Sequence, residues 1–377
     1  MTAFVLGVGM TRFTKWNGIA AETLGGRAIL AALRDADIER TAIDAAFFGS
    51  VQGGVGIGQR VLSGLEMTGM PITNVEAACA SGGSALREAV MWIEAGAIDV
   101  ALVVGIDILT AKSSGPIEPA QRDPLKVAVP IPGIYALTAA RYMHECDVSA
   151  ADLAAVAVKN RANGAMNQFA HFRSPVTVHE VLGSPMIAEP LTRLQCCPNV
   201  DGAAAAIVVS ESAARRLGIH RAIRIAGGAL ASGGPADRTG VRRETTRRTA
   251  NLAYAQAGVG PEDLDLCEVH EPFTISEPLH VESLGLCAQG YGARYITDGY
   301  ADIDGKGVAI NPSGGLIARG HPLGATGLAQ VHEIVTQLRG EAKDRQVVGA
   351  RVGLTHIFGG SFPEIEGDAC SVHIFTR

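Results

Sequence analysis

Residues 311–327 have the sequence Asn-Pro-Ser-Gly-Gly-Leu-Ile-Ala-Arg-Gly-His-Pro-Leu-Gly-Ala-Thr-Gly. Two glycine-bearing turns flank His321, and a proline follows it directly. So constrained a backbone is costly unless it positions something. The stretch therefore indicates a histidine that the backbone positions for a function. A histidine that only supports the turn is the alternative. A phosphate-binding loop is excluded because no Gly-Lys-Ser/Thr follows the glycines.

A second stretch, in the first half of the chain, has the same layout. Cys79-Ala-Ser-Gly-Gly-Ser-Ala-Leu follows the extended segment 71–78 and enters a predicted helix, as the stretch after His321 does. The N–H groups and dipole of that helix are expected to lower the pKa of the Cys79 thiol and favour a nucleophilic thiolate. Taken alone, a buried and inert cysteine is the commoner interpretation. Two equivalent turns would nevertheless bring a nucleophile and a base to one shared site.

His270 stands at the end of the short apolar segment 266–269 and is followed by Glu271 and Pro272. A histidine at a strand end is well placed to donate a hydrogen bond to a developing oxyanion. Pro272 is predicted at the first turn of a helix, and Glu268 and Glu271 are interpreted as structural or orienting groups. No metal is expected, because His-Glu lacks the second histidine four residues on that a zinc protease motif requires.

His356 ends another apolar segment, 352–356, just before paired glycines. Glycine N–H groups in such a turn form a nest that binds anions. A histidine that only caps a strand end is the alternative. The cysteines other than Cys79 are interpreted as buried and inert.

Composition favours a soluble protein with large, well-buried cores. The 377 residues are 47% hydrophobic and 19% charged, enough to bury two or three domains' worth of core. The net charge of -6 argues against a nucleic-acid surface. Seven cysteines, an odd number without a CxxC pair, fit a reducing cytoplasm better than a disulfide framework. Residues 1–13 lack the pattern of a signal peptide, and the apolar run 100–108 is too short to span a membrane.

Apolar segments alternate with Ala/Leu-rich helical stretches along most of the chain. Strands are predicted at 3–8, 45–51, 100–106, 204–209, 223–226, 352–356 and 371–375, and helices at 23–35, 84–95, 247–257, 278–284 and 328–338. This alternation predicts β–α crossover units in a layered α/β fold. Segment 109–198 breaks the alternation with a Pro-rich stretch at 129–133 and several short turns. We predict that it supplies a lid or substrate-binding loops.

Taken together, these segments resemble the thiolase superfamily nearly from end to end. Val-Glu-Ala-Ala-Cys79-Ala-Ser-Gly is similar to its nucleophile motif, and Gly-His321-Pro-Leu-Gly-Ala to its glycine-histidine-proline motif. Val-His270-Glu-Pro-Phe and Leu-Thr-His356-Ile-Phe-Gly-Gly fall where its other two motifs stand. Residues 135–160 and 201–205 resemble the branch of the sterol carrier protein X thiolases, together with thiolase-like acetyl-CoA acetyltransferases.

The resemblance implies roles for these residues. Cys79 would carry an acyl group from a CoA thioester, and His321 would activate its thiol. The N–H groups of Cys79 and of Gly359 or Gly360 would form one oxyanion hole, and His270 would contribute to another. Ser232 and Gly233 are weak candidates for contacts along the pantetheine. No permanently bound cofactor is implied, because coenzyme A enters as substrate.

Two departures from the family matter. Most thiolases have a second cysteine in the last motif, where His356 stands, and the sterol carrier protein X branch has it where Pro272 stands. Condensation or thiolysis needs a group that exchanges a proton with the thioester α-carbon. His356 is the candidate substitute. Thiolysis or condensation of CoA thioesters remains the favoured reaction. Alternatives are acyl transfer to a non-CoA acceptor, retro-aldol cleavage, and a non-catalytic CoA-binding subunit.

The implied fold has two similar β/α halves in a layered αβαβα arrangement. We predict an N-terminal half from 1–108 with 199–220, an inserted loop domain at 109–198, and a C-terminal half at 221–377. A homodimer in cytoplasmic lipid metabolism is expected, without a nucleic-acid or membrane partner. The related aldolase branch pairs with a small OB-fold protein and uses tyrosines in place of the cysteine. Tyr291 and Tyr295 keep that alternative open, and retention of Cys79 weighs against it.

Overall fold

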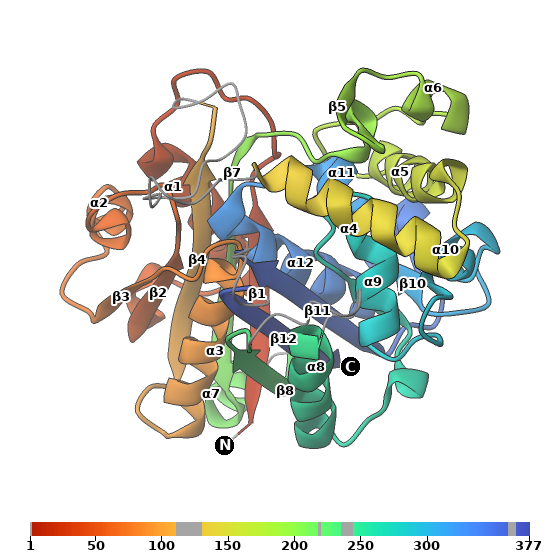
Figure 1. Ribbon diagram of the computed structural model, residues 1–377. Coiled ribbons are helices and arrows are strands. Elements are labelled where there is room, and N and C mark those ends of the chain that lie inside the picture. The colour runs from red at the N-terminus through yellow and green to blue at the C-terminus, as the bar shows by residue number, and fades with distance from the viewer. Residues whose placement is uncertain (1, 111–129, 218–219, 235–243, 361–366) are drawn as a thin grey trace.

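A computed structural model describes residues 2–110, 130–217, 220–234, 244–360 and 367–377 (Figure 1). Its main sheet has ten strands in the order β10-β9-β11-β12-β8-β1-β7-β4-β2-β3. The strands are β1 (Ala3–Met10), β2 (Ala45–Gly49), β3 (Ile72–Val75), β4 (Val100–Ile108), β7 (Asp201–Ser210), β8 (Ile223–Ala231), β9 (Leu266–Glu268), β10 (Ala309–Ile310), β11 (Val352–Gly359) and β12 (Ala369–Thr376). Every strand predicted from the sequence is present.

The sheet consists of two halves with one topology. Numbered along the chain within each half, the strand order is 3-2-4-5-1 in both the first five strands and the last five. The halves join where β1 pairs antiparallel with β8, at Ala3 opposite Ile225. The prediction of two similar β/α halves is confirmed.

Two helices fill the space between the halves, α3 (Ser81–Glu94) and α12 (Leu323–Leu338). Their apolar residues share one buried cluster with strands of both halves. Helices α1 (Ala21–Ala36), α8 (Glu244–Ala257) and α9 (Ser276–Ser283) cover the outer faces. Figure 1 shows α3 and α12 between β4 and the pair β11–β12. The layers therefore follow the predicted αβαβα order.

The starts of α3 and α12 touch backbone to backbone. A Cβ atom on Gly82 would lie 2.4 Å from the carbonyl oxygen of Gly324, and one on Gly327 would lie 2.7 Å from the nitrogen of Gly83. Side chains at these positions would force the helices apart. This contact brings the turns that precede the two helices together, and those turns carry Cys79 and His321.

Segment 109–198 contains more regular structure than the sequence predicted. Two long helices, α4 (Ile131–Cys146) and α5 (Ala150–Ala165), are followed by α6 (Val178–Leu182) and the hairpin of β5 (Met186–Ala188) and β6 (Leu191–Thr192). The prolines at 130 and 132 suggested a loop, but Pro130 is the N-cap residue of α4 and Pro132 lies in its first turn, where proline is tolerated. Its standing as a separate inserted domain stays a prediction.

The remaining helices are short. They are α2 (Ile57–Ser63), α7 (Glu211–Arg216), α10 (Gly292–Thr297) and α11 (Gly315–Arg319). Four 3-10 turns complete the secondary structure of the described residues: η1 (Arg40–Ala42), η2 (Arg193–Gln195), η3 (Pro261–Asp263) and η4 (Lys343–Arg345). None of the helices in the described ranges combines the length and apolarity needed to cross a membrane.

Candidate active site

Cys79 lies in a tight turn between β3 and α3. Ala78, just before it, has a positive φ of 48°, which few residues other than glycine adopt readily. The Ser81 hydroxyl closes the turn, accepting from the N–H of Ala77 at 2.9 Å and donating to the carbonyl of Ala78 at 2.6 Å. A Cβ atom on Gly359 would lie 2.5 Å from the carbonyl oxygen of Ala77. The end of β11 therefore supports the nucleophile turn from behind.

The expectation of a lowered thiol pKa is wrong. Burial raises the pKa of Cys79 to about 12, and the charges of Asp107 and Asp368 act in the same direction. Hydrogen bonds from the N–H groups of Gly360 and of Cys79 itself offset only part of this rise. Desolvation of the sulfur therefore outweighs the helix terminus. Cys79 rests as a neutral thiol and needs a neighbouring base.

His321 has the geometry of that base. The sulfur of Cys79 and one ring nitrogen each of His270 and His321 all lie within 4.8 Å of one another. Thr326 donates its hydroxyl proton to the carbonyl of Pro322 at 2.9 Å, so at 2.8 Å it accepts from Nδ1–H of His321. This arrangement leaves Nε2 of His321 with a free lone pair. Burial lowers the pKa of His321 to about 3, which keeps the ring neutral.

His270 faces His321 across the site. Their Nε2 atoms are 3.4 Å apart. Because Nε2 of His321 carries no proton, the contact is favourable only when Nε2 of His270 carries one. Burial, followed by the charges of His321 and His356, lowers the pKa of His270 well below its usual value. His270 is therefore neutral, and before substrate binds its Nε2–H is directed at the Nε2 lone pair of His321.

His356 does not reach the same space. It is fully buried, and its Nδ1 accepts a hydrogen bond from the backbone N–H of His270 at 3.4 Å. Its Nε2 lies 3.1 Å from the hydroxyl of Thr246, which also contacts Nδ1 of His280 at 3.1 Å. Burial lowers its pKa to about 3. The structure thus places His356 behind His270, where its Nδ1 holds the backbone N–H of that residue.

The predicted glycine and pantetheine positions separate into two groups. Gly360 borders the cavity beside Cys79, and Gly359 lies directly against the nucleophile turn. Ser232 and Gly233 follow β8 and are held elsewhere: Arg248 donates to the carbonyl of Ser232 at 2.7 Å. The structure does not place these two residues in the cavity lining.

Two buried carboxylates hold the His321 turn in place. Glu268 pairs with Arg319 at 3.0 Å and accepts from the hydroxyl of Ser313 at 2.6 Å. Asp107 accepts from the N–H of Gln52 and from that of Gly324, each at 2.6 Å. No sequence motif marks Asp107 as part of the site. Its position at the end of a buried strand was the only signal.

A cavity of about 890 Å³ opens in front of the three converging side chains. Segment 109–198 supplies much of its wall, including Ile131, Tyr135, Arg161 and Leu194. Three of these residues lie on helices α4 and α5, and the prediction that the segment binds substrate stays a prediction. The same wall holds Cys196 and Cys197, which the sequence analysis treated as inert.

The expected helix start at Pro272 is wrong. Thr274 donates to the carbonyl of Gln195 at 3.0 Å, and Cys197 donates to the carbonyl of Pro272 at 2.8 Å. Residues 195–197 and 272–274 therefore run antiparallel beside each other, and α9 begins only at Ser276. Proline fits here because its carbonyl is the group that this pairing uses.

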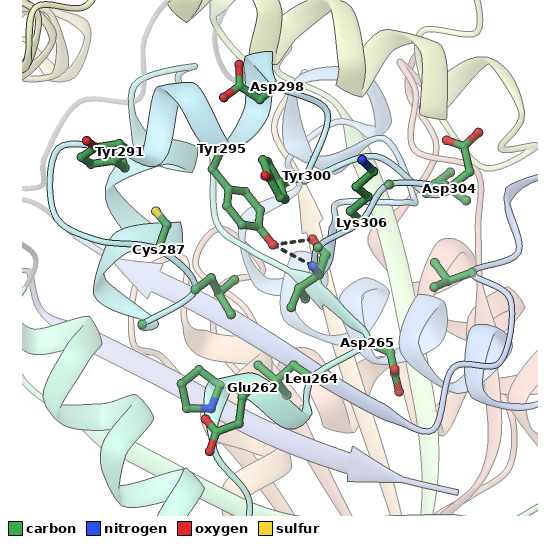
Figure 2. A pocket seen from close by; sticks show the side chains of 18 of the residues that line it. Glu262, Leu264, Asp265, Cys287, Tyr291, Tyr295, Asp298, Tyr300, Asp304 and Lys306 are labelled. Atoms are coloured by element: carbon green, nitrogen blue, oxygen red, sulfur yellow. Dashed lines mark hydrogen bonds between the residues drawn. The ribbon is translucent and has the colours of Figure 1, made fainter.

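A second cavity, of about 1150 Å³, lies on the C-terminal half (Figure 2). It is lined by Tyr291, Tyr295 and Tyr300. Figure 2 shows Tyr295 bonded to the backbone of Val308, whose N–H donates to its hydroxyl at 2.6 Å. Tyr291 and Tyr295 do not line the Cys79 cavity, so they are not positioned to act in its chemistry.

Among the described residues, Cys79, His270 and His321 are the group whose ligand atoms lie close enough together to hold a metal ion. Thiolate and imidazole are ligands that Zn²⁺ prefers. The lone pair of His321 and the thiol of Cys79 are equally the partners of a proton transfer. That the protein works without a metal stays a prediction.

The fold and this site together define a class, the cysteine-dependent acyltransferases of thiolase architecture. Residues 3–212 match the family model described as thiolase, N-terminal domain, and residues 227–366 match the thiolase C-terminal domain-like model. The chain belongs to the thiolase family and is an acyl-CoA acyltransferase.

Two curated relatives and one solved structure illustrate the match. The benzoylsuccinyl-CoA thiolase subunit BbsB of Thauera aromatica is 40% identical, over 95% of this chain and 94% of its own. An acetyl-CoA acetyltransferase of Methanothermobacter thermautotrophicus is 40% identical, over 99% of both chains. The Ltp2-ChsH2(DUF35) aldolase is 26% identical, covers 100% of this chain and 98% of its own, and has a TM-score of 0.86.

Proposed function

We propose that the protein thiolyses or condenses CoA thioesters through an acyl group carried on Cys79. The observation that carries this proposal is the convergence of the Cys79 sulfur with nitrogens of His270 and His321 within 4.8 Å, at the wall of the cavity. Covalent acyl transfer needs a nucleophile, a base and an oxyanion donor, and each of the three residues has the state that one of these roles requires.

In the acylation step, Nε2 of His321 takes the thiol proton of Cys79 as the sulfur attacks the thioester carbonyl. The carbonyl oxygen gains negative charge, which the Nε2–H of His270 and nearby backbone N–H groups stabilise. Burial raises the pKa of the thiol and lowers that of the imidazole, so both groups are neutral before the reaction and the proton transfer accompanies the attack on the carbonyl.

The cavity wall suits a CoA ester. Lys15 and Arg193 are exposed cations at its edge, suitable for phosphate groups, and Ile131, Leu194 and Phe273 offer an apolar surface. We assign the acyl chain to this surface. The role of Ser232 and Gly233 along the pantetheine remains part of the proposal, although neither lines the cavity.

We also propose a cytoplasmic homodimer in lipid metabolism with a small OB-fold protein as partner. The names of two similar proteins support a partner: one is a thiolase subunit, and the other is an aldolase that includes a DUF35 protein. Retro-aldol chemistry through Tyr291 and Tyr295 is disfavoured, because both lie at the second cavity. Light scattering of the purified chain separates monomer from dimer.

Intact-protein mass spectrometry tests the covalent step. Incubation with acetyl-CoA, or with a longer acyl-CoA, should add one acyl group to Cys79, and Cys79→Ala should add none. A protein that no acyl-CoA labels would sink the acyl-enzyme mechanism and favour a non-catalytic CoA-binding subunit.

A further inference from the structure

The site has one unfilled role. Thiolysis releases a carbanion at the thioester α-carbon, and some group must give that carbon a proton. His321 is occupied with the proton of Cys79, His270 donates to the oxyanion, and His356 lies behind the backbone of His270. The missing group must border the cavity and must hold a transferable proton.

Cys197 meets both conditions. It is half-buried in the wall of the cavity that also exposes Cys79, His270 and His321. Its backbone N–H donates to the carbonyl of Pro272 at 2.8 Å, and Cys196 bridges antiparallel to Phe273. Cys197 thus lies directly opposite Pro272 in an antiparallel pair. Pro272 is the position where the sterol carrier protein X branch has its second cysteine. The thiol is carried by the neighbouring strand instead.

We propose that Cys197 is the second thiol of this site, giving a proton to the thioester α-carbon in thiolysis and taking one from it in condensation. This inference rests on the proposed function and names the group that completes it. The neighbouring Cys196 is not equivalent, because its sulfur donates to the carbonyl of Thr192 at 3.3 Å within its own turn.

The protons and electron pairs of thiolysis balance with this assignment. The adduct of Cys79 with the β-carbonyl of a 3-oxoacyl-CoA collapses, which breaks the bond between Cα and Cβ and leaves acyl-Cys79. The electron pair stays on Cα and takes the proton of Cys197, so that the CoA thioester containing Cα leaves, as acetyl-CoA when the substrate is unbranched. An incoming CoA thiol then passes its proton to the Cys197 thiolate and attacks acyl-Cys79. The departing Cys79 sulfur recovers its proton from His321.

The electrostatic surroundings agree with an acid at rest. Burial, then the charges of Cys196, Glu271 and Cys79, raise the pKa of Cys197 well above its usual value. Cys197 therefore holds its proton until a strongly basic carbanion forms nearby.

Exchange of the α-protons of acetyl-CoA in D₂O isolates this step from acylation. Cys197→Ala and the near-isosteric Cys197→Ser should lose exchange by about 10²- to 10⁴-fold, the usual share of a general acid–base. Both should still take an acyl group on Cys79 at a rate within about fivefold of the parent protein. Cys287→Ser, at a cysteine that lines the second cavity and not this one, is the matched control and should retain exchange within about threefold, and Cys196→Ser should lose less exchange than Cys197→Ser.

The outcomes separate the two claims. If the parent chain is acylated but Cys197→Ala exchanges α-protons as fast as the parent chain, Cys197 is not the second thiol. The acyl-Cys79 mechanism then stands. If the parent chain takes no acyl group, the proposed function itself fails. Loss of exchange in Cys196→Ser equal to that in Cys197→Ser would overturn the assignment to Cys197. Circular dichroism and the retained acylation establish that the variants are folded.

Discussion

Nε2 of His270 lies 3.4 Å from Nε2 of His321, and the two rings cross at 67°. The His321 nitrogen of this pair carries a lone pair and the His270 nitrogen carries a proton, because Thr326 fixes the tautomer of His321. Two histidines therefore lie side by side, one with an Nε2 that can accept a proton and one with an Nε2 that donates a hydrogen bond. The hydrogen bond that His321 makes through Nδ1 determines this difference.

Removal of the base should slow acylation far more than binding. For His321→Ala we expect the rate of Cys79 acylation by acetyl-CoA to fall about 10²- to 10⁴-fold, as measured by rapid quench and mass spectrometry. Thr326→Val removes only the hydroxyl that orients the ring, so a loss of about tenfold or less is expected. Equal losses in both variants would show that Thr326 has a further role in the fold.

The donor role of His270 predicts a difference between two substitutions. His270→Ala removes the N–H directed at the oxyanion and should lower kcat about 10²- to 10³-fold. His270→Asn keeps an N–H donor of similar reach and should recover a large part of this loss. Steady-state thiolysis of acetoacetyl-CoA measures both. A kcat for His270→Asn as low as that of His270→Ala would argue that the imidazole transfers a proton.

The structure gives His356 a supporting role that can be tested directly. His356→Ala leaves the N–H of His270 and the hydroxyl of Thr246 without their shared partner and creates a buried cavity. Such changes cost about 2–4 kcal/mol of unfolding free energy, measurable by urea denaturation. In the fraction that remains folded, α-proton exchange should persist. Full stability combined with lost exchange would return His356 to the position of the missing base.

The sequence predicted the centre of this site because glycine and proline restrict the backbone in ways that are visible locally. The turns at Cys79 and His321 and the strand end at His270 were all assigned in this way. The repeated layout of the two turns also predicted that they meet, since equal βα units packed around α3 and α12 bring equal positions together.

What the sequence could not predict depends on contacts between distant segments. Cys197 faces the cavity only because residues 195–197 pair with 272–274, and no local pattern marks that pairing. The pKa of Cys79 depends on how much water the whole cavity wall excludes, so the helix dipole alone predicted the wrong direction. His356 had the right motif position, but packing against His280 and Thr246 directs its ring away from the cavity.

The contact between the two central helices predicts an intolerance to small additions. In Gly82→Ala the new methyl group would lie 2.4 Å from the carbonyl oxygen of Gly324, so the helices must separate. We expect a loss of about 1–3 kcal/mol in unfolding free energy together with slower acylation, because the Cys79 turn moves with α3. Gly26→Ala in α1 is the control. Its methyl group would meet only Leu65, at 3.6 Å, so stability should be unchanged or slightly higher.

Acid should destabilise the fold through its buried histidines, and His373 offers the simplest test because it lies outside the cavity lining. Burial lowers its pKa to about 3, whereas the unfolded chain has the ordinary value near 6.5. The folded form thus binds fewer protons between these values, so its stabilising contribution is complete above pH 6.5 and is lost as pH falls toward 3. At pH 5 the loss is about 2 kcal/mol for this group.

His373→Gln should therefore shrink the difference in unfolding free energy between pH 7 and pH 5 by that amount, as followed by urea denaturation at both pH values. The exposed His144→Gln serves as control, and a pH 7 to pH 5 difference that His373→Gln leaves unchanged would contradict the assignment.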